Sequence, residues 1–589
     1  MCGIFGYVGK NTRAQELVFE GLKTLEYRGY DSWGVAAKSA KKFIVEKHVG
    51  KIGNSKLNRV LHSLNSRLSI GHTRWATHGG VTDKNAHPHL DCTGEIAVVH
   101  NGIIENFEEI KKKLLKKGHK FISETDTEVL PHLIEENMKK EGFASSVRDA
   151  FNALKGLNAI VVASSVASEI IAAKNGSPLI IGKTDGNLFI SSDASGILNH
   201  TNDLIFLKDN EMAILGKKIQ LLKLPKGKKL NITFEKIFWK KEKSDKGKFK
   251  HFMIKEIYEQ PKVIKNIENM TDEIRKLTNL IKKAKGTFFI GSGTAYNACL
   301  AGQYLFSKVA RKHVNTLFAS EFNYLEDFLN KKSLIIALSQ SGETIDVIET
   351  LNRAKLKGSK IVAITNTLGS TIYRMANYKM LLLAGPEKAV ASTKAYVAKL
   401  AVFLMLVYSF TGKLKEAKMI LQKTENEVER LLNKKSIIEI KKVARKLYLT
   451  EHIFTVGRGV SFSTALEAAL KIKEVSYIHT EGLAGGELKH GTIALITEGT
   501  PCIVFAPNDE TYQSTISSAT EIKSRGGFII GISPGNSSVF DQWIEVKDTK
   551  EGSYITQIIP AQLISYYIAI LKKLDPDKPR NLAKSVTVK

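Results

Sequence analysis

The segment TFFIGSGTAYNACLAGQYL (287–305) decides the fold of the C-terminal half, because the chain repeats its pattern as IFTVGRGVSFSTALEAALK (453–471). Each copy reads as an apolar strand, a Gly-x-Gly turn and a helix. Two later strands repeat at a similar offset of about 167 residues, namely SLIIALSQSGET (333–344) with TPCIVFAPNDET (500–511), and KIVAITNT (360–367) with GFIIGISP (527–534). A constant offset over three strands predicts two copies of a doubly wound α/β domain.

Residues 2–222 follow a different pattern. Short β-type runs such as EIAVVHNG (95–102) alternate with turns, and helical patterns interrupt them near 14–25 and 107–116. This pattern predicts stacked antiparallel sheets with helices on their faces. The expected fold class is multidomain α/β, with a sheet sandwich at 2–222, a lysine-rich linker at 223–250, doubly wound domains at 251–430 and 431–575, and a tail at 576–589.

The chain is strongly basic, with 87 Lys+Arg against 59 Asp+Glu and a net charge of +28. The lysines are spread along the chain, without a helix-turn-helix, an aromatic RNA-binding motif or a zinc finger. We therefore expect a solvated basic surface that attracts anionic substrates, and no nucleic-acid partner.

Cysteine usage and hydropathy indicate the compartment. The four cysteines are widely separated and form neither a zinc spacing nor a disulfide framework, so we expect no metal. The N-terminus lacks the pattern of a signal peptide, and the longest apolar run, Leu400 to Phe410, is shorter than the ~20 residues that a membrane span needs. We expect a cytoplasmic protein with no membrane partner.

Cys2 is a candidate nucleophile, because removal of Met1 would place a thiol and its own α-amine base on one residue. Arg74 could hold a substrate carboxylate through a bidentate fork, and Asp126 could hold an α-ammonium group. Asn101 and Gly102 follow a strand and offer donors for the oxyanion of acyl transfer. Together these residues indicate an amidase for a free amino acid.

The motifs MCGIFGYVG, EYRGYDSWG, GHTRWATHGG, NAHPH, VVHNGIIEN and SETDTE closely resemble the N-terminal-nucleophile glutamine amidotransferase domain family. The resemblance implies an αββα sandwich with Cys2 as the nucleophile and with Asn101 and Gly102 as the oxyanion hole. Trp33 departs from the small residue usual in this motif. The implied glutamine-binding residues are Arg74, Trp75, Thr77, His78 and Asp126, with Trp75 as the gate of an ammonia channel.

The turn SQSGET (339–344) places hydroxyls and an amide between a strand and a helix, which suits a neutral phosphate cradle. An ordinary serine N-cap is the alternative. The second copy has Asp509 and Glu510 in this turn, which would repel a phosphate. A dinucleotide site is disfavoured, because Tyr296 and Phe462 stand where a third glycine would be needed.

SQSGET is a hallmark of tandem sugar isomerase domains. With FMIKEIYEQP, AVASTKAY, ALKIKEVSYIH, GGELKHG and PRNLAKSVTVK, the chain resembles the family of glutamine-dependent enzymes that aminate fructose 6-phosphate. The resemblance implies L-glutamine and D-fructose 6-phosphate as substrates, D-glucosamine 6-phosphate as product, no cofactor and a homodimer.

The resemblance also implies catalytic roles in the C-terminal half. Lys584 would form a Schiff base with the open-chain sugar, Glu474 would move a proton between C1 and C2 with Lys471 nearby, and His490 of the neighbouring subunit would open the ring. Unaided, the sequence allows a solvated tail lysine and a surface ion-pair ladder on one helical face instead. The implied sugar-phosphate-binding residues are Thr294, Ser339, Gln340, Ser341, Thr344, Val390, Ser392 and Ala583.

Ala295 stands where the family usually has a sugar-binding serine. Two alternatives therefore remain open at this point. The first is amination or deamination of another sugar phosphate, and the second is a catalytically inactive phosphosugar sensor.

Overall fold

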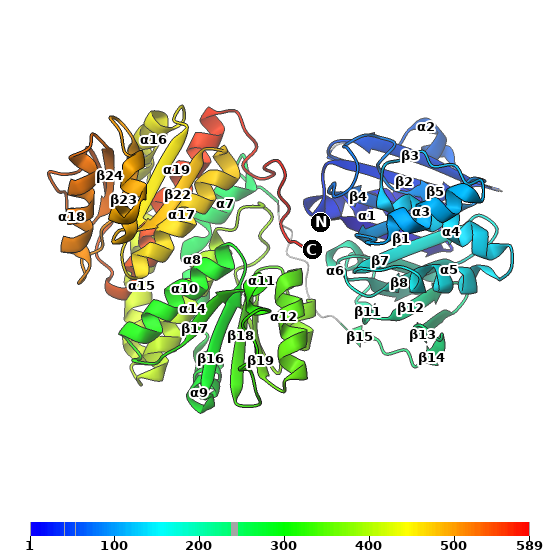
Figure 1. Ribbon diagram of the computed structural model, residues 1–589, viewed down its shortest axis with the longest axis horizontal. Coiled ribbons are helices and arrows are strands. Elements are labelled where there is room, and N and C mark those ends of the chain that lie inside the picture. Colours follow the sequence, from blue (N-terminus) through cyan, green and yellow to red (C-terminus); the bar gives the residue numbers. More distant parts are fainter. Residues whose placement is uncertain (1, 41, 54, 237–244, 588–589) are drawn as a thin grey trace. The chain divides into compact units, whose positions relative to one another are not determined.

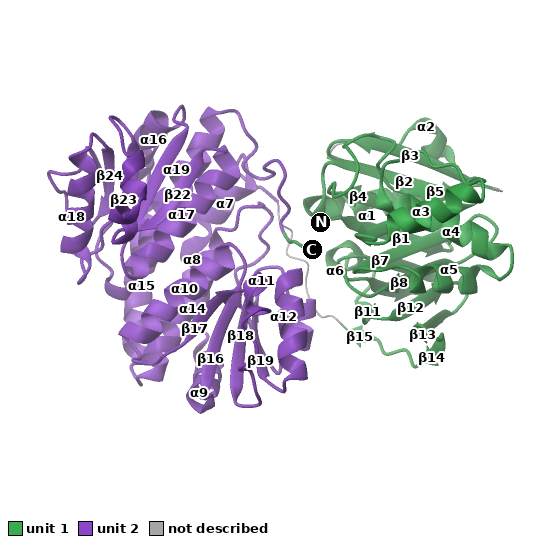
Figure 2. Cartoon of the chain, in the orientation of Figure 1, with its two compact units in different colours: residues 1–243, 585–589 green, residues 244–584 purple. Residues whose placement is uncertain are grey.

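The computed structural model describes residues 2–40, 42–53, 55–236 and 245–587. The chain forms two compact units, shown in different colours in Figure 2. Unit 1 comprises Met1–Lys243 with Ser585–Lys589, and unit 2 comprises Ser244–Lys584.

Unit 1 contains two antiparallel sheets. The eight-stranded sheet has the order β15 (Glu235–Lys236), β11 (Asp203–Phe206), β9 (Ile180–Thr184), β10 (Asn187–Ser191), β1 (Gly3–Gly9), β4 (Leu68–Arg74), β2 (Ser32–Lys38), β3 (Phe43–Val49). The seven-stranded sheet has the order β14 (Lys228–Leu230), β13 (Ile219–Lys223), β12 (Glu211–Leu215), β8 (Ile170–Lys174), β7 (Asn158–Ser164), β6 (Ile96–Gly102), β5 (His89–Leu90).

Helices cover the outer faces of both sheets (Figure 1). The helices of unit 1 are α1 (Ala14–Leu25), η1 (Glu26–Arg28), α2 (Arg59–Ser63), α3 (Phe107–Lys116), η2 (Asp126–Glu128), α4 (Val129–Met138), α5 (Phe143–Asn152) and α6 (Ala194–Ile197). One apolar core fills the space between the sheets, and two others lie under α1 and under α3 to α5. This is the expected αββα sandwich, and the helices expected near 14–25 and 107–116 are confirmed as α1 and α3.

The structure adds two findings to the sequence reading of unit 1. Residues 228–236 lie in the stretch expected to be a linker, yet they form β14 and β15 at the sheet edges. Their lysine-rich pattern hides short edge strands, which need little apolar surface. Trp33 is 2% exposed and packs between Phe19 and His48, so its bulk fills the core under α1.

Unit 2 contains two five-stranded parallel sheets. The first has the order β17 (Asn315–Phe318), β16 (Gly286–Gly291), β18 (Ser333–Ser339), β19 (Lys360–Thr365), β20 (Tyr378–Leu381). The second has the order β22 (His479–Ala484), β21 (His452–Gly457), β23 (Pro501–Phe505), β24 (Phe528–Ser533), β25 (Gln542–Glu545). The two orders correspond strand by strand, which confirms the repeat.

The helices of unit 2 pack on both faces of each sheet. They are α7 (Phe252–Tyr258), α8 (Gln260–Glu268), α9 (Thr271–Lys283), α10 (Thr294–Lys308), α11 (Ala319–Phe322), α12 (Ile345–Leu356), α13 (Thr371–Met375), α14 (Lys394–Phe410), α15 (Leu414–Leu431), α16 (Lys434–Leu447), α17 (Val460–Ser476), η3 (Glu487–His490), η4 (Thr492–Leu495), α18 (Tyr512–Lys523), η5 (Lys550–Gly552) and α19 (Ser553–Leu571). One continuous core joins the two halves through α10, α14, α17 and α19.

Two apolar segments lie inside that core. The run Leu400 to Phe410 is the buried helix α14, as expected. By length and composition alone, residues 550–571 could cross a membrane. However, 83% of the apolar 18-residue window within them is buried in the protein. Burial of this kind is typical of a core helix.

Candidate functional site

Cys2 lies immediately before β1, next to the end of β4. The Trp75 N–H donates a hydrogen bond to the Cys2 sulfur over 3.3 Å, and the Asn101 side-chain amide donates to the Cys2 carbonyl oxygen over 3.1 Å. Burial raises the pKa of the Cys2 thiol, while the Trp75 N–H and the Arg74 guanidinium oppose that rise. The two sheets of unit 1 therefore bring the expected nucleophile and Asn101 together.

His72 fixes the orientation of the Asn101 amide. Burial lowers the pKa of His72 to about 3, so its ring is neutral near pH 7. Its Nε2 lies 3.0 Å from the His100 carbonyl oxygen and 3.1 Å from Asn101 Oδ1, so this nitrogen must carry the proton. Because Oδ1 accepts from His72, the Asn101 NH₂ group faces Cys2.

Gly102 extends the same strand with a φ of +146°. A Cβ at this position would lie 2.3 Å from the Leu157 carbonyl oxygen, so only glycine fits.

Arg74 and Asp126 anchor the loops around Cys2. The Arg74 guanidinium donates to the carbonyl oxygens of His78, Gly79 and Gly80 over 2.5–3.2 Å. The Asp126 carboxylate accepts from the Ile104 N–H over 2.7 Å. Both residues therefore hold backbone around Cys2, in addition to the glutamine-binding roles expected from the sequence.

The other residues expected to bind glutamine differ in how far they are exposed to solvent. Trp75 and His78 are half-buried, while Thr77 is exposed. The His78 ring packs edge-on against Phe107.

Three residues near Cys2 received no role from the sequence. The buried Arg28 donates to the Cys2 carbonyl oxygen over 3.3 Å, and Asp31 accepts from the Ala76 N–H over 2.8 Å. Together with His72 they lie within the motifs EYRGYDSWG and GHTRWATHGG. These motifs are the sequence signal that could have identified the three residues. The contacts that the residues make across strands cannot be inferred from the motifs.

In unit 2, two turns lie at the carboxyl ends of the neighbouring parallel strands β16 and β18. Strand β17 lies on one side of β16 and β18 lies on the other, so the strand order reverses at β16. Doubly wound sheets bind ligands at such a switch point. Gly293, which precedes α10, has a φ of +54°, and Gly459 adopts the same value before α17. Thr294 follows in the first turn, and Ser339 to Thr344 form the second.

The serines of the second turn organise its backbone. Ser339 Oγ accepts from the Gly342 N–H over 3.0 Å, and Ser341 Oγ accepts from the Glu343 N–H over 3.2 Å. Thr344 is the N-cap residue of α12 and makes no side-chain cap hydrogen bond. Gly342 has a φ of +68°, and a Cβ there would lie 1.9 Å from Ser370 Oγ. The serines thus shape the turn and do not act as an ordinary cap.

A buried ionic cluster on α17 faces Thr294. Lys471 Nζ lies 3.5 Å from Glu467 Oε1, contacts Glu474 Oε2 and donates to Thr294 Oγ1 over 3.1 Å. Thr294 Oγ1 in turn donates to Glu467 over 3.0 Å. Glu467 and Lys471 side chains are 0% exposed, which rules out a solvated surface ladder.

Electrostatics keep Lys471 charged. Burial favours the neutral amine, but Glu474 and Glu467 outweigh it and raise the pKa of Lys471. Burial raises the pKa of Glu467.

Lys584 is also buried, and its Nζ lies 2.6 Å from Glu387 Oε2. Burial opposes ionisation of Glu387, but Lys584 and backbone donors lower its pKa to about 2. Ser392 Oγ donates to the same carboxylate over 2.9 Å. Glu387 was not identified from the sequence, although it lies just before the AVASTKAY motif.

Lys399 connects these two groups electrostatically. Burial lowers the pKa of Lys399 to about 8, while Glu387 and Glu467 raise it and Lys584 lowers it further. The Lys584 pair and the α17 cluster therefore share one charged interior.

The remaining expected sugar-site residues are placed as follows. The Val390 N–H donates to the Asp577 carbonyl oxygen over 3.0 Å, and Gln340 and Ala583 are half-buried. Ala295 is 7% exposed and points into the core of unit 2. His490 ends η3 and is exposed, without a hydrogen bond or ion pair to the residues that the structure describes.

Comparisons with known proteins agree with this division. The glutamine amidotransferase domain family matches residues 72–199, and the SIS domain family matches residues 280–409 and 446–572. The chain is 42% identical over the full length of both chains to "Glutamine--fructose-6-phosphate aminotransferase [isomerizing]" from Thermococcus kodakarensis, and 44% identical, again over both full lengths, to its namesake from Pyrococcus horikoshii. A solved C-terminal domain of glucosamine-fructose-6-phosphate aminotransferase from Francisella tularensis superposes with a TM-score of 0.54 at 32% identity, covering 57% of this chain and 100% of that domain.

Proposed function

The chain belongs to the glutamine–fructose-6-phosphate aminotransferase (isomerizing) family, and from this premise we propose how its own residues perform the reaction. The substrates are L-glutamine and D-fructose 6-phosphate, and the products are L-glutamate and D-glucosamine 6-phosphate. The reaction is the entry into amino-sugar (hexosamine) synthesis.

Cys2 performs the first half of the reaction. Its sulfur attacks the glutamine amide carbon, with the α-amine exposed by loss of Met1 as the base. The Asn101 NH₂ group and the Gly102 N–H stabilise the oxyanion. Collapse of this intermediate breaks the C–N bond and releases ammonia, and water then hydrolyses the thioester to glutamate and the free thiol. The orientation that His72 imposes on Asn101 supports this assignment.

Unit 2 performs the second half. His490 assists ring opening, and the hydroxyl turn Ser339–Thr344 holds the phosphate. The Lys584 amine condenses with the C2 carbonyl, losing water, and ammonia then displaces the lysine to leave a C2 imine. Glu474 removes a proton from C1 and returns it to C2, while the C1 hydroxyl proton passes to the imine nitrogen, so that C1 becomes the aldehyde and C2 carries the amine.

The observation that carries the proposal is the burial of the Lys584 amine against Glu387, beside the Glu467–Lys471–Glu474 cluster. A buried lysine is costly unless it is paired. The pair supplies an amine that is held in place and becomes nucleophilic once its proton is transferred. Burial lowers the pKa of the neighbouring Lys399 amine to about 8.

His490 and the compartment complete the proposal. The exposed position of His490 supports its use by the active site of a second subunit, so the enzyme is a homodimer. Scattered cysteines support a cytoplasmic location.

Product analysis with glutamine and fructose 6-phosphate tests this function. The wild type should form glutamate and glucosamine 6-phosphate in equal amounts. Cys2→Ala should lose both products, whereas Lys584→Ala should still form glutamate and lose the amino sugar. Lys435→Ala, at an exposed lysine on α16, is the matched control and should behave as wild type.

One result would contradict the acceptor. If the wild type hydrolyses glutamine but leaves fructose 6-phosphate unaminated, the sugar assignment is wrong. Other ketose phosphates should then be tried, with Ala295 as the first residue to restore to serine.

A further inference from the structure

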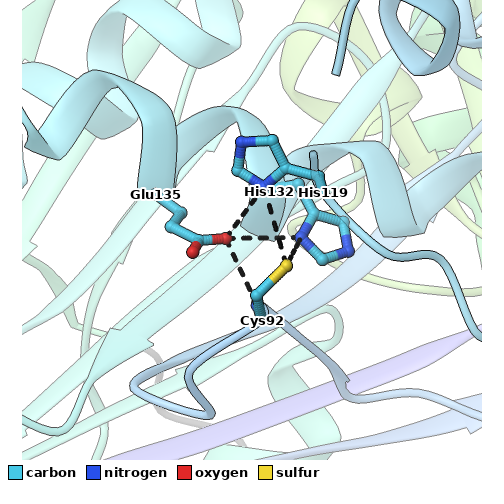
Figure 3. Close-up of side chains that lie close together, drawn as sticks. All are labelled: Cys92, His119, His132 and Glu135. Carbon is cyan, nitrogen blue, oxygen red and sulfur yellow. Dashed lines mark hydrogen bonds and ion pairs between the residues drawn. The ribbon is translucent and has the colours of Figure 1, made fainter. Parts of the chain in front are cut away.

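Four potential metal ligands converge in unit 1, away from Cys2 in sequence and on three different segments (Figure 3). Cys92 follows β5, His119 follows α3, and His132 and Glu135 lie one turn apart on α4. One ligand atom from each residue lies within 4.8 Å of all the others. No spacing in the sequence indicates this cluster, because Cys92 and His119 are separated from each other and from the His132–Glu135 pair along the chain.

The distances fit a tetrahedral metal centre. Cys92 Sγ lies 3.7 Å from His119 Nδ1 and 3.5 Å from His132 Nδ1. Glu135 Oε2 lies 3.1 Å from His119 Nδ1 and 3.4 Å from His132 Nδ1. Zinc bonds of the usual lengths give tetrahedral ligand separations of about 3.6 Å for sulfur to nitrogen and about 3.3 Å for nitrogen to oxygen.

Carboxylates lie behind both imidazoles. His119 Nε2 is 3.3 Å from Glu136 Oε2, and His132 Nε2 is 3.8 Å from Glu128 Oε1. Metal-bound histidines commonly turn their second nitrogen towards a carboxylate in this way, which fixes the ring and increases the basicity of the ligand.

A network of hydrogen bonds without a metal explains this arrangement poorly. Glu135 Oε2 faces both Nδ1 atoms and also accepts from the Cys92 N–H over 3.2 Å. His132 Nε2 is buried without a hydrogen-bond partner among the described residues, and the His119 and His132 side chains are only 4% and 2% exposed. A bound cation would let both Nδ1 atoms, the Cys92 sulfur and Glu135 Oε2 face one centre as its ligands.

We propose that Cys92, His119, His132 and Glu135 bind one Zn²⁺ ion in a closed, structural site. Sulfur, nitrogen and oxygen donors in a tetrahedral arrangement suit Zn²⁺, and four protein ligands leave no position open for catalysis. This site goes beyond the proposed function and replaces the expectation from the cysteine spacing that the chain holds no metal.

The site would hold the Cys92 loop and the end of α3 against α4. Helix α4 begins directly after η2, which carries Asp126. The ion would therefore steady the segment that anchors Ile104 beside the Cys2 site. Binding energy of this kind adds to the stability of the fold.

Metal analysis of the full-length protein tests the proposal. Protein produced in zinc-supplemented medium and freed of loose metal should carry about one Zn²⁺ per chain. Cys92→Ser and His132→Gln should each weaken Zn²⁺ binding at least about tenfold. Cys502→Ala and His313→Gln, which alter a cysteine and a histidine outside the cluster, should keep the ion.

Two further measurements guard against variants that fold poorly. A chelator should lower the melting temperature of the wild type and leave that of Cys92→Ser nearly unchanged. Co²⁺ added to the metal-free wild type should give a tetrahedral spectrum with a thiolate-to-metal band, which Cys92→Ser should lack.

The proposal is overturned if the wild type holds no ion and its melting temperature is insensitive to both Zn²⁺ and chelator. It is equally overturned if Cys92→Ser and His132→Gln bind Zn²⁺ as tightly as the wild type, because the ion would then lie elsewhere.

Discussion

The two halves of unit 2 share a strand order but have divided the chemistry between them. In the first half the turn after β18 carries Ser339 and Ser341, whose hydroxyls organise the backbone. In the second half the turn after β23 carries Ala506 and Asn508 at the positions of these serines, followed by Asp509 and Glu510. Lys308 Nζ lies 2.6 Å from Glu510 and 3.8 Å from Asp509, so this turn now binds the end of α10.

The helices after the Gly-x-Gly turns show the opposite division. Helix α17 of the second half carries Glu467, Lys471 and Glu474, and this cluster contacts Thr294 of the first half. The corresponding positions on α10 are Ala301, Leu305 and Lys308, of which the first two are buried in the core. Each half has thus kept one part of the proposed site, and neither half is complete alone.

The largest effect is expected from a substitution on α17, in the second half. Glu474→Gln keeps the size of the side chain but removes the base that moves the proton, so kcat for amino-sugar synthesis should fall about 10²- to 10⁴-fold. Glutamine hydrolysis should persist. Steady-state assays of both products measure the two activities.

Lys308→Gln is the matched change on α10, because it occupies the equivalent position in the first half. It removes only partly exposed ion pairs with Asp509 and Glu510 and should leave kcat unchanged. Equal losses in both variants would mean that packing between α10 and α17 matters, and not the carboxylate of Glu474.

A smaller effect is expected from making the first turn acidic. Ser341→Asp introduces a negative charge beside the phosphate, and repulsion of about 2–3 kcal/mol should raise KM for fructose 6-phosphate by about 30- to 150-fold. Asp509→Ser, which removes a negative charge from the turn of the second half, should leave that KM unaltered. If Asp509→Ser shifts KM as strongly, the phosphate binds at the second turn and the assignment of the cradle is wrong.

Much of this comparison was accessible from the sequence. Local periodicity predicts the strand repeat and the helices α1 and α3. Comparison of the two copies shows the loss of hydroxyls in the second turn. Spacing on α17 placed Glu467, Lys471 and Glu474 on one face. It could not say whether that face is buried, because burial depends on α10, more than a hundred residues away.

The remaining features depend on contacts between distant segments. Glu387 meets Lys584 across nearly two hundred residues, and the Cys92 cluster joins three separate segments. Short edge strands such as β14 carry too little apolar pattern to be recognised. Local pattern therefore predicted the elements and the motif residues, whereas partners and protonation states required the folded structure.

The last contrast concerns the loops that precede helices α14 and α19. The loop before α14 carries the buried Glu387, and Glu256 lies close enough for the two carboxylates to interact. Burial first, and Glu387 second, raise the pKa of Glu256 from 4.5 to about 8. The loop before α19 instead carries Asp548, which is exposed.

The stability of the Glu256→Gln variant should depend on pH differently from that of the wild type. Between pH 4.5 and 8 the folded wild type keeps a proton on Glu256 that the unfolded chain releases. Its stability should therefore fall as pH rises, by up to about 1.4 kcal/mol per pH unit. The glutamine cannot titrate, so its melting temperature relative to wild type should be higher at pH 8 than at pH 6 in calorimetry. Asp548→Asn should show no such change, and a constant difference for Glu256→Gln would mean that Glu256 is ionised throughout this range.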